Sequence, residues 1–179
     1  MRHGQFMGWF WVALGALLSW QGPTAVAANW PRFRGPNGTG IATQSDIPIR
    51  WTEQEGVLWK TSLPGAGNSS PVVWGDRVFL QSSSADGKER SLLCLKATDG
   101  KLLWSRAVSG SQARMHTKNT LASSTPATDG ERVYALFWDG QDLLLTAYDF
   151  QGQLIWKREL GAFTSQHGAG TSPIVWKDK

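Results

Sequence analysis

The sequence is poor in several features that would point to particular classes of protein. Charged residues make up 18% of the 179 residues, below the usual quarter, and lysine and arginine form no block, so a nucleic-acid surface is not indicated. The hydrophobic fraction of 41% is too high for a disordered chain. The single cysteine, Cys94, lies in the apolar run 92–95, and the sequence shows no evident basic partner for it. This setting favours a buried strand residue over a nucleophile.

No apolar run is long enough to cross a membrane comfortably. The run from Phe6 to Trp20 has about 15 residues, fewer than the ~20 that a spanning helix needs. It follows a short basic start and precedes small residues at 25–28, the pattern of a cleaved secretory signal. No cysteine stands directly after this run, which excludes lipid attachment at a mature N-terminal cysteine. We therefore predict a signal peptide over 1–28, a periplasmic or extracellular location, and a mature chain without a transmembrane span.

Tryptophan is abundant, with 11 residues, and three of these recur in one local pattern. The segments 57–60, 102–105 and 154–157 each read as two apolar residues, tryptophan and a polar residue. A second pattern, Ser-Pro or Thr-Pro before a short apolar run, recurs in step at Pro71, Pro126 and Pro173. Two patterns repeating together roughly every 50 residues predict stacked supersecondary units.

Each unit is predicted to contain four short strands. Gly-Asp and Asp-Gly pairs between apolar runs indicate tight turns, and no stretch after the signal keeps a helical period for three turns, so the predicted class is all-β. The strands are expected at 71–74, 77–82, 91–96 and 101–108 in the first unit, and at 126–128, 132–138, 143–149 and 153–160 in the second.

Four-stranded antiparallel units at this period are the blades of a β-propeller. Trp59, Trp104 and Trp156 fall on the outermost strands, where a large ring can cover the neighbouring blade, so we assign them a blade-docking role. Residues 57–63 are expected to be a lone fourth strand that completes the last blade and removes an exposed edge. Two complete blades and a third beginning at 172 cannot close a ring. We therefore expect the N-terminal part of a longer protein, with a lead segment over 29–56 and repeats over 57–179.

The segment 94–104 resembles the signature of the PQQ-like (quinoprotein-type) propeller repeat: a short strand, an Asp, a Thr-Gly turn, and a strand ending in Trp. The segment 147–156 fits the signature with a turn one residue shorter, and the first blade departs from it in having Lys96 where the second has Asp149. The opening 29–36 is similar to the mature start of exported PQQ-like repeat proteins often described as outer-membrane assembly scaffolds. The resemblance implies a propeller in the cell envelope.

The loops from the last strand of one blade to the first strand of the next are rich in polar residues. These loops, 64–70, 109–124 and 161–171, should lie at the mouth of the channel, and functional residues concentrate on loops held by a rigid scaffold. The loops contain two histidines but no third ligand, so we predict no metal site. The alternative to a binding role is that the Asn, Ser and His side chains form hydrogen bonds with unpaired backbone groups at the channel rim. The candidate ligand or partner face comprises Asn68, Ser69, His116, Lys118, Asn119, Gln166 and His167.

Three functions stay open. The first is a non-catalytic, cofactor-free scaffold with a protein or small-molecule ligand at the channel mouth, since no catalytic set is left once the turn carboxylates are accounted for. The second, which the resemblance implies, is a dehydrogenase that uses PQQ and calcium and whose remaining blades lie beyond this chain. The third is a hydrolytic or sugar-active propeller that uses the channel-mouth loops. The turn carboxylates are Asp76, Asp86, Asp99, Asp129 and Asp139.

Overall fold

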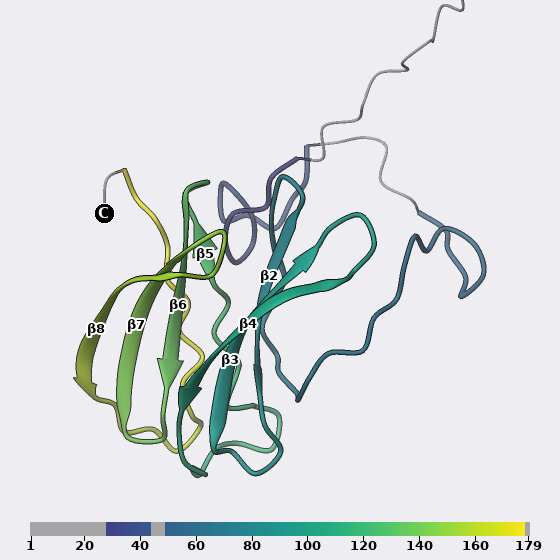
Figure 1. Cartoon of the computed structure of the whole chain (residues 1–179). Coiled ribbons are helices and arrows are strands. Elements are labelled where there is room, and N and C mark those ends of the chain that lie inside the picture. The colour runs from purple at the N-terminus through teal and green to yellow at the C-terminus, as the bar shows by residue number, and fades with distance from the viewer. Residues whose placement is uncertain (1–27, 44–48, 178–179) are drawn as a thin grey trace, which may run out of the picture.

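A computed structural model describes residues 28–43 and 49–177. These residues form an all-β structure of two four-stranded antiparallel sheets that lie beside each other (Figure 1). The all-β class and the incomplete ring are confirmed. The segment proposed as a signal peptide lies, up to residue 27, outside the described residues. Among the described residues there is no helix long and apolar enough to span a membrane.

Both sheets are simple meanders, in which each strand pairs with the next along the chain. The strand boundaries match those expected from the sequence to within one or two residues, the usual ambiguity of element ends. The first sheet contains β1 (Val72–Trp74), β2 (Arg77–Ser83), β3 (Glu89–Lys96) and β4 (Leu102–Ser109). The second contains β5 (Ala127–Thr128), β6 (Arg132–Trp138), β7 (Asp142–Asp149) and β8 (Leu154–Ala162).

The core lies between the two sheets. Because side chains alternate across a strand, each sheet turns one apolar row toward the other. Phe79 on β2 and Cys94 on β3 are direct neighbours in the first sheet, and both are fully buried. The second sheet contributes Val133 and Phe137 from alternate positions of β6. The full cluster comprises Val72, Phe79, Leu92, Cys94, Val133, Ala135, Phe137 and Tyr148.

Two segments expected to be strands have no strand partner in the described structure. Residues 57–63 form no strand, and neither do 172–177, where a third blade was expected to begin and where Lys177 lies in a turn. A fourth strand needs a third strand beside it, and among the residues that the structure describes none lies next to 57–63. The segment is held instead through Trp59, which packs against the first sheet.

The lead segment pairs with the inner edges of both sheets, a contact that the sequence does not predict. Trp30 and Val73 of β1 exchange two backbone hydrogen bonds, of 2.8 and 3.0 Å. The next carbonyl, that of Pro31, accepts a 2.8 Å hydrogen bond from the amide of Thr128 in β5. The lead therefore joins the first strands of the two sheets, near the turns that follow them.

Burial sets the chemistry of the single thiol. Because Cys94 is enclosed between the sheets, desolvation raises its pKa from 9.0 to about 12. Between these values the folded state holds a proton that the unfolded state has lost, so Cys94 makes stability fall as the pH rises from about 9 to 12.

We expect Cys94 to stay unreactive toward a maleimide at pH 8 in the native protein and to react fully in denaturant, because the thiolate is the reacting form. Mass spectrometry of the labelled chain measures both. Fast labelling without denaturant would contradict the burial of this strand.

Candidate functional site

Two of the three repeated tryptophans make the same contact with the following sheet. The indole nitrogen of Trp59 donates a 2.8 Å hydrogen bond to the carbonyl of Ala97, and that of Trp104 donates a 2.9 Å bond to the carbonyl of Phe150. Each ring also lies on the glycine of the adjacent turn. A Cβ atom added to Gly100 would clash with the Trp59 ring, and one added to Gly152 would stand 2.8 Å from Trp104.

Glycine is required at these two turn positions for two separate reasons. Gly100 and Gly152 have φ angles of +70° and +81°, which side-chain-bearing residues rarely adopt. The absent side chain also leaves the space that the indole fills. The local turn chemistry and the packing of one sheet on the next therefore depend on the same residue.

Trp156 occupies the equivalent position of the second sheet, but no further sheet of the described residues covers it. Across the sheets, the row Phe79–Cys94–Trp104 corresponds to the row Tyr134–Ala147–Trp156. Trp156 is 38% exposed and contacts the Tyr134 ring at a centroid distance of 5.9 Å.

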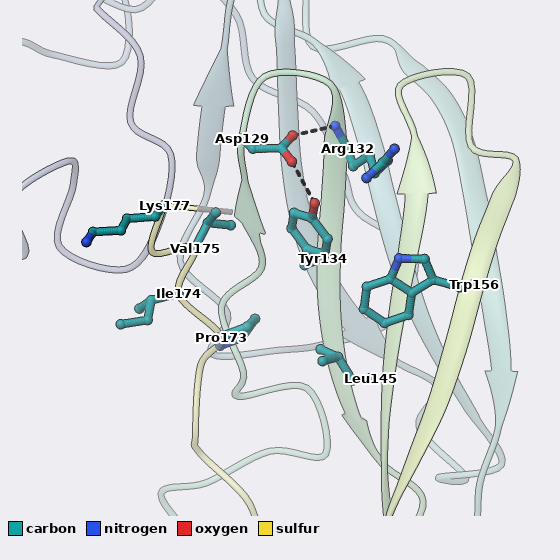
Figure 2. Close-up of a pocket in the computed structure, with 9 residues that line it drawn as sticks. All are labelled: Asp129, Arg132, Tyr134, Leu145, Trp156, Pro173, Ile174, Val175 and Lys177. Atoms are coloured by element: carbon teal, nitrogen blue, oxygen red, sulfur yellow. Dashed lines mark hydrogen bonds between the residues drawn. The ribbon is translucent and has the colours of Figure 1, made fainter. Parts of the chain in front are cut away.

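A cleft of about 450 Å³ lies over this second row. Figure 2 shows Tyr134, Leu145 and Trp156 on the sheet, with Pro173 and its neighbours on the segment beside it. Since the equivalent row of the first sheet is buried against the second, the cleft is an uncovered packing face of a blade rather than a built ligand pocket.

One carboxylate at the edge of that cleft is held by its own turn. The hydroxyl of Tyr134 donates a 2.6 Å hydrogen bond to Asp129, which also accepts a bond from the backbone amide of Arg132 (Figure 2). Burial would raise the pKa of Asp129, but these hydrogen bonds outweigh it and lower the pKa. Burial and the bond to Asp129 raise the pKa of Tyr134. Neither group is therefore prepared to transfer a proton near neutral pH.

The three loops of the candidate face come together at one end of the sheets, away from the lead. The side-chain amide of Asn68 donates a 2.9 Å hydrogen bond to the carbonyl of Lys118. The side-chain amide of Asn119 donates to the carbonyl of His167. The rings of His116 and His167 lie 5.7 Å apart between centroids. We refer to the surface formed by 64–70, 109–124 and 161–171 as the loop face.

Several residues of the loop face use their polar atoms to fix the backbone. Nδ1 of His116 accepts a 3.1 Å hydrogen bond from the amide of Lys118, so a neutral His116 carries its proton on Nε2. The hydroxyl oxygen of Ser69 accepts a 3.0 Å bond from the amide of Gln81 in β2. The exposed residues of the face are Asn68, His116, Lys118, Gln166 and His167, and Ser69 and Asn119 are half-buried.

Sequence reasoning did not identify Arg90 as a residue that positions this face. Its side chain is only 1% exposed, and it donates to the carbonyls of Trp138 at 2.9 Å, Ser111 at 2.7 Å, and Gly87. Desolvation lowers the pKa of the guanidinium, although it stays charged. The only signal in the sequence is a cation that opens the apolar segment 90–95, directly after Lys88 and Glu89. Arg90 links the start of the loop 109–124 to both sheets.

The described residues do not fit calcium with PQQ. Calcium takes six to eight oxygen ligands, and the chain as described from 28 to 43 and from 49 to 177 has no group of three or more His, Cys, Asp or Glu side chains placed to share a metal. The turn carboxylates are engaged locally. Asp139 accepts two 2.8 Å bonds from backbone amides of its own turn, and Asp149 accepts bonds of 3.0 and 2.7 Å in the same way. The described residues therefore assign no catalytic role to calcium or PQQ.

Comparison with known proteins places this fold. A family of PQQ-like repeats described as outer membrane protein assembly factor BamB matches residues 41–178, and no curated protein sequence matches. Among solved structures, BamB from Moraxella catarrhalis is 21% identical with a TM-score of 0.44, over 61% of this chain and 30% of that one. A europium-containing methanol dehydrogenase is 18% identical with a TM-score of 0.35, over 52% of this chain and 15% of that one. The chain thus spans less than a third of either structure. It belongs to the BamB family of PQQ-like repeat proteins.

Proposed function

We propose that this chain is part of an exported, non-catalytic scaffold that binds a protein partner through its loop face. The observation that carries the proposal is that the loops are fixed to one another and to the sheets by their own side chains, through Asn68, Ser69, His116 and Asn119. A surface fixed before binding loses less conformational entropy when a partner docks. Such a surface is suited to recognition.

The setting in the cell envelope has separate support. The matched family is described as an outer membrane protein assembly factor, which favours a protein partner over a small molecule. The segment 1–28 has the features of a secretory signal. The blade-docking role of Trp59, Trp104 and Trp156 belongs to the same proposal, since stacked blades would hold successive loops on one face.

The bonds within the loop face count against His116 as the general base of a hydrolytic site. A general base needs a free lone pair within reach of the substrate, yet Nδ1 of His116 is occupied by a backbone amide. The one thiol of the chain, Cys94, lies in the core and is protonated.

Two measurements on the intact protein test the scaffold. With PQQ and calcium added, we expect no alcohol-dependent reduction of a dye and no thermal shift. With a photo-crosslinking residue at Lys118, we expect a crosslink to an envelope protein in cells. The same residue at Lys157, on the exposed strand β8, should give none.

Dye reduction together with a thermal shift would establish the dehydrogenase and end the proposal. Crosslinks from position 157 but not from 118 would show that a different surface binds.

A further inference from the structure

Two clefts open on the loop face, and both are built from the same three parts. In the first, of about 480 Å³, the walls are the loop that enters the first sheet, the β2–β3 turn, and the loop that leaves the sheet. In the second, of about 520 Å³, they are the loop that enters the second sheet, the β6–β7 turn, and the loop that leaves it. Gln112 lines both clefts and so forms a shared wall.

A backbone contact holds the entering loop beside each cleft. Ala66 exchanges two hydrogen bonds, of 3.0 and 2.8 Å, with Ser83 at the end of β2. Ser111 donates a 2.8 Å bond from its amide to the carbonyl of Asp139, directly after β6. Each entering loop is thus held against the end of the second strand of its sheet. The cleft is a repeated feature of the blade.

The two clefts differ in chemistry. The first is lined by small and apolar side chains, among them Ala66, Met115 and Leu121. The second offers an aromatic pair, Trp138 and Phe163, whose rings meet edge to face at a centroid distance of 6.3 Å. Arg114 stands beside that pair.

The charge of the loop face has one sign. Its three loops contain Arg114, Lys118 and two histidines, and they contain no aspartate or glutamate. The neighbouring turns carry Asp86 and Asp139, which accept hydrogen bonds from amides of their own turns and do not line either cleft. Arg114 is the one charged side chain that lines either cleft, which favours a negatively charged partner there.

We propose that the loop face binds an extended, acidic segment of polypeptide. Such a segment would place apolar or aromatic side chains in the two clefts and carboxylates beside Arg114 and Lys118. This inference rests on the proposed scaffold function and names the chemistry of its partner. Concave clefts separated by the wall at Gln112 suit the side chains of a peptide, whereas the flat surface of an anionic bilayer would leave them unfilled.

The test uses the intact protein and two fluorescein-labelled 12-residue peptides, one repeating Glu-Phe-Gly and the other Lys-Phe-Gly. We expect fluorescence anisotropy to show the acidic peptide binding about tenfold or more tightly, with affinity falling as the salt concentration rises. The double variant R114Q/K118Q should lose about tenfold in affinity. The matched control K157Q/R158Q removes the same charge from β8 and should stay within about twofold.

Equal binding of the two peptides would overturn the inference, as would unchanged binding by R114Q/K118Q at an unaltered thermal midpoint. Binding to vesicles that contain phosphatidylglycerol, without binding to the acidic peptide, would also overturn it. If crosslinking from position 118 to a protein partner persists in any of these cases, the scaffold function stands and only the chemistry assigned to the partner fails.

Discussion

Replacing Trp104 by alanine is expected to lower the free energy of unfolding by about 3–5 kcal/mol. The indole lies against the core, with its ring 5.9 Å from that of Phe79 and 6.4 Å from that of Tyr148. Truncation removes this aromatic packing and leaves the carbonyl of Phe150 without its donor. Urea denaturation of the intact protein, followed by near-ultraviolet circular dichroism, measures the change.

Two further variants separate the parts of this effect. Trp104→Phe keeps most of the ring but loses the hydrogen bond to Phe150, so it should cost about 1–2 kcal/mol. Trp51→Ala removes a tryptophan that is 67% exposed and should change stability by less than about 0.5 kcal/mol. A cost below about 1 kcal/mol for Trp104→Ala would show that the indole does not hold the sheets together.

The strands could be predicted because their signals are local. In the first sheet, apolar residues recur through β2 and β3, and Gly75 stands in the turn that joins β1 to β2 with a φ of +56°. The contact of Trp104 with the next sheet was predictable for a different reason. A residue that recurs at the period of the repeat meets the same surroundings in every unit.

The contacts of the lead could not be predicted in this way. Trp30 pairs with Val73 through backbone atoms only, and such a bond leaves no pattern in the side chains. The partners of Arg90 are also backbone carbonyls, at Trp138 and Ser111, far along the chain. The role of a buried arginine becomes clear only when the fold shows which carbonyl oxygens surround it.

The sequence predicted which loops form the candidate face, but not what each side chain on those loops does. The connection from one sheet to the next must return to the same end, so His116 and His167 were both assigned to loops at that end, and their rings lie 5.7 Å apart. The orientation of each side chain depends on which carbonyl lies within reach. Asn119 faces the carbonyl of His167, whereas Lys118 is exposed to solvent.

Replacing Arg90 by alanine is the second change expected to have a large effect, a loss of about 3–5 kcal/mol. The substitution leaves a cavity where the side chain lay and removes the donors from the carbonyls of Trp138, Ser111 and Gly87. Part of that cost is offset because a desolvated cation is no longer buried. Three hydrogen bonds from a charged donor, at about 1.5–3 kcal/mol each, outweigh this relief. Urea denaturation measures the difference from the native protein.

The position of Arg90 also predicts where the damage appears. Its bond to the carbonyl of Ser111 holds the first residues of the loop 109–124, so the amides of Gly110 and Ser111 should lose protection from hydrogen exchange before the sheets unfold. Arg158→Ala removes an exposed cation from β8 and should leave both stability and exchange within error. If Arg90→Ala cost less than about 1 kcal/mol and left exchange at 110–111 unchanged, the loop face would owe its order to the bonds among its own side chains. Its preorganisation for a partner would then be independent of the packing between the two sheets.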